Sequence, residues 1–281
     1  VSRFAAVAFA FAFVVLVTAP SWCSRGQLSI LVEFYCYLAL AQLWNLLAGY
    51  AGVISLGQQA FLGLGGYCLF FLCLILGVHP MVALIAAGIV GALVAAPCAL
   101  VVLRLHGAHL AIGTWVVAEI FRLLFSEVTA LGAGSGISLP VQVARAIDWP
   151  ILRRDGVLYL LSLSLATLSI VLPYWLLCSR HGLALTAIRD NEQTARTSGI
   201  DSRNVKLATF IAVGGGTALT GAVMFLDKLR ISPTAAFDAN WTSYIIFIVI
   251  IGGIGTLEGP IVGTVLFFLL RQYLSDLAGW Y

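Results

Sequence analysis

The charged side chains of this chain gather in residues 180–206, the longest strongly polar stretch of a very apolar sequence. Its charged residues are Arg180, Arg189, Asp190, Glu192, Arg196, Asp201, Arg203 and Lys206. Five of these residues are basic and three are acidic, so the stretch is not a simple basic tail. Neither a Ser/His pair nor an H-E-x-x-H pattern accompanies these charges, so the stretch does not predict hydrolytic or zinc chemistry.

A short helix is predicted inside this stretch. Asn191 can cap its first turn through the side-chain oxygen, and Glu192 lies favourably at the positive end of the helix dipole. Gly199 can take the left-handed conformation that ends a helix. Two interpretations follow: a solvated loop between two membrane helices, or a docking helix on the membrane surface that a cytoplasmic partner holds.

The composition indicates a membrane protein. Hydrophobic residues make up 61% of the 281 residues and charged residues 10%, whereas soluble domains carry about 25% charge. The mean hydropathy is +1.04. The net charge of +3 is too small to suggest a nucleic-acid partner. Several apolar runs of about 20 residues predict an all-α, polytopic bundle in the lipid bilayer, with about eight or nine membrane segments.

The apolar runs place these segments within one membrane domain over residues 1–281. We expect helices over residues 4–20, 28–48, 81–103, 110–125, 157–178 and 207–226, a glycine-rich segment continuing to 78, and two segments within 241–270. Polar connections are expected at 126–156 and 180–206. Glu119 and Arg122 are three residues apart on one helix and can form an ion pair.

Two glycine-rich interruptions fall at membrane depth, in residues 49–66 and 252–260. Close helix packing through small residues is one explanation. The other, which we favour for residues 49–66, is a broken or re-entrant segment along a water-filled path, because irregular backbone is tolerated there only where protein or water satisfies it. The residues expected at the translocation path are Gly49, Gly52, Ser55, Gly57, Gln58 and Gln59.

The basic residues predict the orientation. Five of them lie within residues 180–206, and this density predicts that the stretch is cytoplasmic. Arg3, Arg104 and Arg271 are then expected on the same side, and the 126–156 connection is expected in the periplasm.

Several motifs, in one order along the chain, carry a family resemblance. Gly49-Tyr50-Ala51-Gly52 with Ser55-Leu56-Gly57 and Ala60-Phe61 resembles the G-Y-x-G-x-x-S-L-G-x-x-A-F segment of LivM-type permeases of branched-chain amino acid ABC importers. Arg189-Asp190-Asn191-Glu192, with Ala195 and Gly199-Ile200, is similar to that family's loop for docking on the ATPase. The region from Leu105 to Arg122, Ser232-Pro233 with Phe237, and Gly252-Gly253-Ile254-Gly255 with Gly259-Pro260 resemble its remaining motifs. The sequence departs from the family at Thr194, often Ala, and at Gln58, often His.

The resemblance implies a permease subunit of the bacterial inner membrane that translocates branched-chain amino acids or related small amides. It implies a homologous second permease, two cytoplasmic ATPase subunits that use ATP and Mg²⁺, and a periplasmic binding protein. The implied docking residues are Arg189, Asp190, Asn191, Glu192, Ala195, Gly199 and Ile200. The chain itself has no P-loop and no cofactor is expected on it.

The main alternative is an ion-coupled secondary transporter of small polar solutes. Such a protein should carry ionisable groups deep in the membrane. Glu33, Glu119 and Glu258 are instead expected near segment ends or breaks, which counts against it. His106 and His109 are three apart, but without a nearby Cys or carboxylate cluster they are weak candidates for a metal site.

Overall fold

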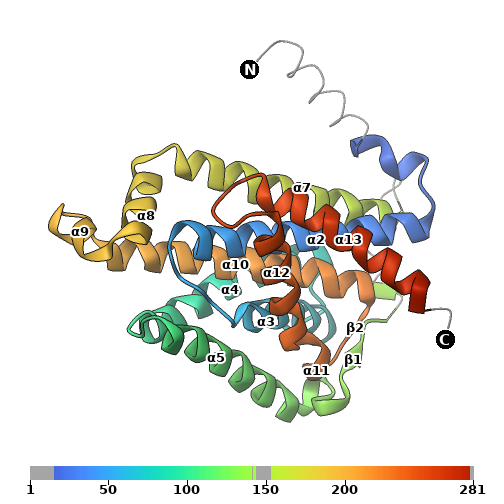
Figure 1. Ribbon diagram of the computed structural model, residues 1–281. Helices are drawn as coiled ribbons and strands as arrows, with labels where there is room; N and C mark the ends of the chain where they lie inside the picture. The colour runs from blue at the N-terminus through green and yellow to red at the C-terminus, as the bar shows by residue number, and fades with distance from the viewer. Residues whose placement is uncertain (1–15, 141, 144–152, 279–281) are drawn as a thin grey trace.

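The computed structural model describes residues 16–140, 142–143 and 153–278, and it is a bundle of helices (Figure 1). Its longer helices are α2 Arg25–Asn45, α3 Gln58–Leu74, α4 Pro80–Val102, α5 Ala108–Glu127, α7 Arg154–Leu177, α8 Arg180–Asp190, α10 Ser202–Lys228, α12 Ala239–Gly252 and α13 Gly259–Ala278. The short elements are η1 Ala19–Ser21, the π-helix η2 Leu46–Tyr50, η3 Thr129–Leu131, η4 Ala133–Ser135, α9 Glu192–Thr197 and α11 Pro233–Ala236. Two short antiparallel strands, β1 Ile137–Ser138 and β2 Arg230–Ile231, pair with each other.

The helices have the lengths that a bilayer requires. Among the described residues, six helical stretches are long and apolar enough to span it, and α3 and α13 are shorter apolar helices. The chain is therefore a multi-pass, all-α membrane protein, as predicted. The span expected at residues 4–20 lies mostly outside the described residues. Both predicted interruptions are confirmed, because helix gives way to irregular backbone at residues 51–57 and 253–258.

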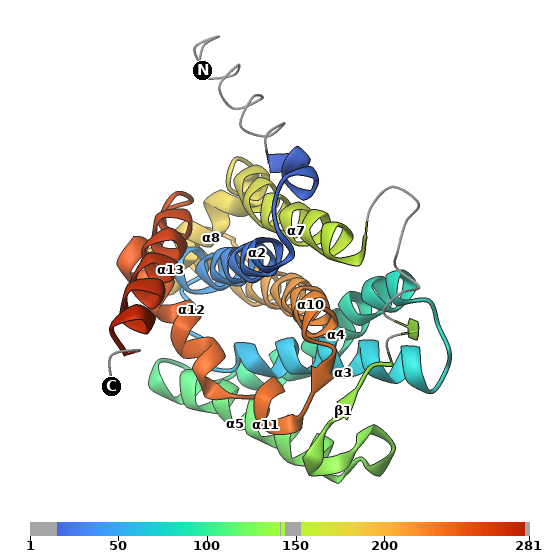
Figure 2. The ribbon, with the colours of Figure 1, turned by 90° about the vertical axis from the view of Figure 1, so that its right-hand side faces the viewer.

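The long helix α10 lies at the centre and packs against α2, α3 and α4 (Figure 2). Glycines allow these close approaches. A Cβ at Gly65 of α3 would collide with the Ala218 carbonyl, and a Cβ at Gly221 of α10 would collide with the Leu62 carbonyl. Small residues at crossing points bring backbones close and increase van der Waals contact, which matters most where lipid supplies no hydrophobic driving force.

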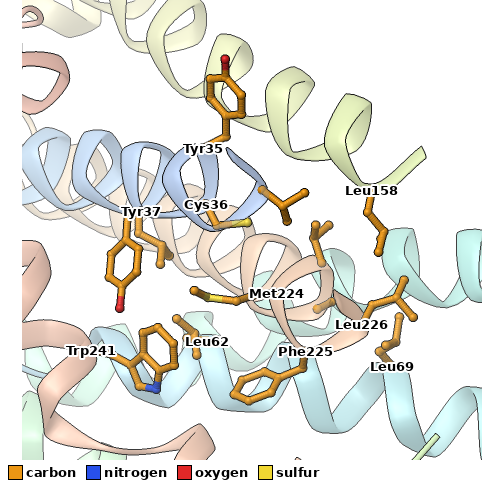
Figure 3. Close-up of a cluster of buried hydrophobic side chains, with 14 of the residues drawn as sticks. Tyr35, Cys36, Tyr37, Leu62, Leu69, Leu158, Met224, Phe225, Leu226 and Trp241 are labelled. Carbon is orange, nitrogen blue, oxygen red and sulfur yellow. The ribbon is translucent and has the colours of Figure 1, made fainter. Parts of the chain in front are cut away.

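The buried apolar core fills the space between α2, α3, α7, α10 and α12 (Figure 3). Tyr35 and Tyr37 lie on either side of α2, and Met224 and Phe225 come from α10. These four side chains are at least nine-tenths buried. The core fixes how α2 lies against α10, and α2 holds the two helix breaks described below.

The bundle has two ends. At the end that we call the β end, β1 pairs with β2, with Ile137 opposite Ile231. The N-terminal half of α2 reaches the same end, where Ser29 donates a hydrogen bond to Asp227, which lies near the end of α10. At the other end, which we call the α9 end, α8 and α9 connect α7 to α10 (Figure 1).

Two charged pairs test the expectations from the sequence. Arg122 Nε donates to both carboxylate oxygens of Glu119 at 2.9 Å, so the predicted ion pair is confirmed. The expected side of Arg271 is wrong. Its Nη1 donates to Glu33 at 2.9 Å, and Glu33 lies in the half of α2 that points to the β end, opposite residues 180–206. Counting charges along the sequence missed this because α13 reverses direction after the 253–258 break.

Candidate functional site: a polar loop joined to two helix breaks

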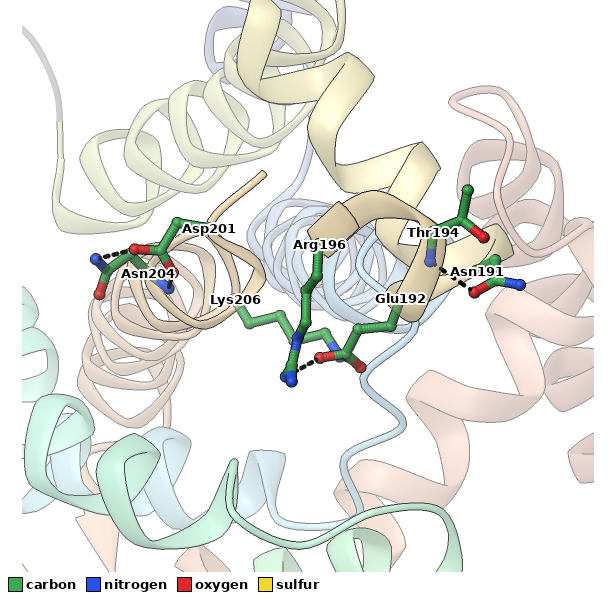
Figure 4. Close-up of polar contacts among 7 residues, drawn as sticks. All are labelled: Asn191, Glu192, Thr194, Arg196, Asp201, Asn204 and Lys206. Carbon is green, nitrogen blue, oxygen red and sulfur yellow. Dashed lines mark hydrogen bonds and ion pairs between the residues drawn. The ribbon is translucent and has the colours of Figure 1, made fainter. Parts of the chain in front are cut away.

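The polar stretch folds as two helices rather than one. Ser179 caps α8 and accepts a hydrogen bond from the His181 amide at 3.2 Å. The one helix predicted here is the second of the two, α9. The Asn191 side chain caps it by accepting from the Thr194 amide at 3.0 Å, as expected (Figure 4). The prediction missed α8, and it also placed the start of the next helix too late. Asp201 caps α10, so Arg203 and Lys206 belong to its first two turns.

The end of α9 is a Schellman motif. Gly199 has φ +85°, and its amide donates to the Arg196 carbonyl at 3.0 Å while the Ile200 amide donates to the Ala195 carbonyl at 3.1 Å. This pairing requires a left-handed residue, which glycine adopts without a Cβ clash. Ala195 is buried, so the helix end is fixed to the bundle. The predicted role of Gly199 as the helix stop is confirmed.

Glu192 faces the bundle rather than the open surface. Its two carboxylate oxygens accept from Lys206 Nζ at 2.6 Å and from Arg196 Nη2 at 2.7 Å; Figure 4 shows the three side chains converging. Burial acts to raise the pKa of the Glu192 carboxyl, but hydrogen bonds and charge from Lys206 and Arg196 outweigh it and lower the pKa below its ordinary value. The ionised carboxylate thus ties α9 to α10.

The other residues expected to dock a partner divide into two groups. Asp190 and Asn191 are exposed at the corner between α8 and α9, and Gly199 is exposed at the far end of α9. Ala195 is buried and Ile200 is half-buried. The surface of α9 that is open to a partner is therefore polar, and it carries the exposed side chains of Gln193, Thr194, Arg196 and Thr197.

The first helix break, residues 51–57, runs as irregular backbone from η2 to the start of α3, with Gly52 in the left-handed region at φ +67°. Side chains of neighbouring helices satisfy its polar groups: the Trp44 indole donates to the Ser55 carbonyl at 2.8 Å, and the Leu56 amide donates to Thr114 Oγ1 at 2.9 Å. A Cβ on Gly57 would collide with the Thr114 carbonyl. The break is thus a specific part of the folded membrane domain, because lipid cannot hydrogen-bond to the unpaired backbone groups and protein side chains do so instead.

Gln58 and Gln59 begin α3 and are both buried. Gln58 Nε2 donates to Thr217 of α10 at 2.5 Å, and Thr242 of α12 donates to Gln59 Oε1. The cavity beside Ser55 and Gly57 holds only about 10 Å³, roughly the space of one water. Ser55, Gly57, Gln58 and Gln59 are therefore closely packed, whereas the expected path residue Gly52 is exposed and lines a separate cavity of about 560 Å³ beside α4 and α10.

The second break, residues 253–258, joins α12 to α13 and is held by α2. Asn45 accepts from the Gly255 amide and donates to the Thr256 carbonyl, both at 2.8 Å. Gln42 donates to the Leu257 carbonyl at 2.7 Å. Both side chains are buried, so one helix face fixes three successive residues of the break.

Arg189 connects the polar loop to both breaks. Its Nη1 donates to the Gly49 carbonyl at 2.9 Å, and a Cβ on Gly255 would lie 3.1 Å from the same nitrogen. The backbone of Arg189 also lies against exposed Gly52, with its Cα 3.5 Å from the position of a Cβ there. The predicted docking residue and the predicted path residues Gly49 and Gly52 thus meet at one point.

Sequence reasoning missed the residues that hold the breaks together. Gln42, Asn45 and Thr114 are polar groups inside apolar helices, and that was the available signal, because such groups are costly in lipid without partners. Their partners lie far along the chain, so the sequence alone did not identify them. Among the described residues, no group of three or more His, Cys, Asp or Glu side chains could hold a metal ion.

Residues 26–281 match the family described as branched-chain amino acid transport system / permease component. The high-affinity branched-chain amino acid transport system permease protein LivM of Escherichia coli K12 is 28% identical over 95% of this chain and 68% of its own length. The probable branched-chain amino acid transport permease protein LivM of Methanocaldococcus jannaschii is 24% identical over 88% of this chain and 80% of its own length. No solved structure matches. The match over nearly the whole chain shows that it belongs to the family of permease components of branched-chain amino acid transport systems.

Proposed function

We propose that this chain is a membrane subunit of an ATP-binding cassette importer that carries branched-chain amino acids or related small amides across a bacterial inner membrane. Its partners in this proposal are a homologous second permease, two ATPase subunits that use ATP and Mg²⁺, and a periplasmic binding protein. The single observation that carries the proposal is the contact of Arg189 with Gly49, because it joins a surface helix pair to a break in a membrane helix.

The geometry of α8 and α9 suits a docking element. The pair is capped at its start by Ser179, closed at its end by Gly199, and anchored by buried Ala195. Asp190 and Asn191 remain exposed at its corner. A short rigid helix with a polar outer face can sit in a groove of another subunit and transmit a push without deforming.

Arg189 provides the route from that push to the membrane. In this mechanism, closure of the ATPase dimer displaces α8 and α9, and the Arg189 guanidinium transmits the displacement to Gly49 and to the second break. Residues 51–57 and 253–258 can move with it, because they are irregular segments between helices. The tight packing around Gln58 and Gln59 then opens to admit solute in the alternate state.

The proposal fixes the orientation of the chain. The α9 end faces the cytoplasm, with residues 180–206, and the β end faces the periplasm, with the 126–156 connection. A cysteine at exposed Ser198, in a chain with exposed Cys178 changed to Ser, tests this. It should react with a membrane-impermeant maleimide only after intact cells are opened. Reaction from outside the intact cell would reverse the topology.

The function is tested by reconstituting the chain with its partner subunits in proteoliposomes. We expect uptake of leucine, isoleucine or valine that requires ATP and the binding protein. An ion-coupled secondary transporter would instead carry solute with this chain alone, in response to an ion gradient. Gradient-driven uptake without ATPase subunits would contradict the proposal.

A further inference from the structure

A hollow lies between α2, α12 and α13, beside the C-terminal end of α10. Its volume is about 570 Å³, within the range of about 300–1,000 Å³ that is usual for small-molecule sites. We call it the aromatic pocket and define it by Tyr37, Lys228, Trp241, Phe247, Phe267 and Arg271. Tyr37, Trp241 and Phe267 are buried in its wall. The Tyr37 ring centroid lies 5.7 Å from that of Trp241 and 5.6 Å from that of Phe267; Figure 3 shows Tyr37 and Trp241 facing each other.

Charges of both signs line the same pocket. Arg271 is paired with Glu33 at 2.9 Å. Lys228 Nζ lies 4.8 Å from the centroid of the Trp241 ring, and no carboxylate of the described residues is within ion-pair distance of it. Asp238 also lines the cavity. The pocket therefore combines aromatic side chains with the Lys228 ammonium over the Trp241 ring and with the Arg271–Glu33 ion pair.

The depth of the ion pair argues that this face does not meet lipid. Glu33 is eight residues from the start of α2 and Arg271 is seven residues from the end of α13, about 12 Å and 10 Å along the helices. The span Arg25–Tyr50 has 26 residues, about 39 Å, against a hydrocarbon thickness of about 30 Å. With this span centred in the bilayer, the pair lies inside the hydrocarbon layer, deeper than the segment-end position expected for Glu33 from the sequence. The Arg271 side chain is nevertheless 52% exposed.

A charge exposed to lipid at such a depth is costly, and ionisable groups inside membranes usually face water-filled paths or other protein. The aromatic pocket gives Arg271 that setting, and Lys228, the last residue of α10, lies at its edge. The lining of the pocket also indicates what it binds. A solute with a positive group, a negative group and an apolar part could contact Lys228, the carboxylates and the aromatic rings at the same time. Glu33 is already paired with Arg271, so the group that lacks a counter-charge among the described residues is Lys228. A neutral solute would leave Lys228 without one, and a purely anionic solute would meet the carboxylates of Glu33 and Asp238 as like charges.

We propose that the aromatic pocket binds a zwitterionic amino acid with an apolar side chain on its way through the importer. Lys228 binds the carboxylate, Glu33 accepts from the ammonium group, and the rings of Phe247 and Phe267 contact the side chain. The inference rests on the proposed function, which sets the class of solute. It adds a binding site on the permease itself, next to the expected path, because Trp241 lines the pocket and its neighbour Thr242 contacts Gln59.

Labelling tests the occupant directly, with the complete importer in lipid nanodiscs. Phe247→Cys, combined with Cys178→Ser, should react with a water-soluble maleimide, and saturating leucine should slow the reaction several-fold. N-acetyl-leucinamide, which has the same side chain and neither charge, should not slow it. Ile250→Cys is the matched control, because Ile250 is exposed on α12 but lies outside the pocket; leucine should leave its reactivity unchanged. No labelling at residue 247, or labelling that leucine does not slow, would overturn the proposal.

A second variant tests the cation. In the Phe247→Cys background, Lys228→Gln should raise the leucine concentration that halves labelling about tenfold or more, the usual worth of a hydrogen bond to a charged group. Arg230→Gln changes an exposed basic residue two positions away and outside the pocket, and should leave that concentration unchanged. An equal effect of both variants would remove Lys228 from the site. ATP-dependent leucine uptake by the unmodified complex is measured separately, and its absence would count against the proposed function rather than against the pocket.

Discussion

The Arg189 guanidinium donates a 2.9 Å hydrogen bond to the carbonyl of Gly49, a residue 140 positions earlier in the chain. The acceptor lies in the π-helix η2, directly before the irregular backbone of residues 51–57. Arg189 is also paired with its neighbour Asp190 through Nε at 3.1 Å. A residue of the surface helix α8 thus hydrogen-bonds to the end of the membrane helix formed by α2 and η2, at the point where that helix breaks.

We predict that Arg189→Ala uncouples ATP hydrolysis from transport. The variant removes the contact with Gly49 but leaves the exposed surface of α9 intact, so the ATPase should still copurify while solute moved per ATP falls several-fold. Arg189→Lys should rescue little, because a single ammonium lacks the planar fork that reaches Gly49 through Nη1 and Asp190 through Nε. Arg180→Ala, an exposed arginine at the start of the same helix, is the control and should couple normally. Loss of ATPase binding in Arg189→Ala would show that this residue docks the partner instead.

Gly199→Val should unwind the end of α9. The position is left-handed, with φ +85°, and a β-branched residue there costs on the order of 1–3 kcal/mol. We expect faster amide exchange at Ile200 and weaker copurification of the ATPase. Gly199→Asn is the matched variant, because asparagine tolerates this conformation, and it should retain most of the binding. If ATPase binding falls equally in Gly199→Val and Gly199→Asn, any side chain at this position interferes with docking, and the left-handed backbone is not the reason for the glycine.

The link between α9 and α10 should depend on pH through Glu192. Its pKa is lowered in the folded protein, so the link is present at neutral pH. It should weaken as the pH falls from the ordinary glutamate value of about 4.3 through the lower folded value. Amide exchange of α9 in the detergent-purified chain should rise over that window. Glu192→Gln should abolish the pH dependence and cost about 1 kcal/mol, the usual limit for a partly exposed pair. A pH profile unchanged in Glu192→Gln would assign the transition to another group.

The sequence predicted the breaks but not what joins them. Glycines and polar residues inside apolar runs are visible along one stretch of chain, and so are the caps at Asn191 and Gly199, because each depends only on residues within a few positions. The reach of Arg189 to Gly49 depends on how α8 returns against α2, which no local pattern encodes. For the same reason Glu192 was expected to contact a partner, whereas Lys206 and Arg196 hold it within the bundle.

The packing of Gly57 changes how the translocation path should be tested. A Cβ at this position meets the Thr114 carbonyl, so a large substitution such as Gly57→Leu would disturb the packing of α3 against α5 whether or not Gly57 lines the path. Gly57→Ala alone should therefore lower the thermal stability of the purified chain, and loss of uptake there would not identify a path residue. Gly134→Ala is the matched control, because a Cβ there has no neighbour within 4 Å. Equal melting temperatures for Gly57→Ala and the unmodified chain would show that α5 can shift away from the added methyl group without loss of stability.

Gln59 offers the sharper test of the path, because its partner is known. Thr242 of α12 donates to it in this state. Thr242→Val keeps the shape of the side chain but removes the donor to Gln59 Oε1 and the acceptor for the Gln59 backbone amide, so it destabilises the closed packing described here. The variant should shift the chain toward the open state and raise ATPase activity in the absence of solute. Unchanged activity, with normal folding, would make the Gln59–Thr242 pair a packing feature only.

Asn45 should be the most sensitive single residue of the second break. Its side chain is fully buried, and it satisfies the Gly255 amide and the Thr256 carbonyl at once, each at 2.8 Å. Asn45→Ala leaves both backbone groups unpaired beside an apolar helix, which costs about 1–3 kcal/mol for each group that water does not reach. We expect a clear fall in melting temperature and faster proteolysis between α12 and α13.

The matched variant for Asn45 is Asn45→Asp. It keeps the acceptor for the Gly255 amide but loses the donor to Thr256, and it brings a carboxylate to within reach of Arg189, which already lies next to Gly255. If the break is held mainly through Gly255, Asn45→Asp should be more stable than Asn45→Ala at neutral pH. On acidification the protonated carboxyl regains an O–H donor for the Thr256 carbonyl, so the advantage of Asn45→Asp should grow as the pH falls. If Asn45→Ala instead melts with the unmodified chain and transports normally, the 253–258 segment is held by Gln42 and by its own turn, and Arg189 would act on the first break alone.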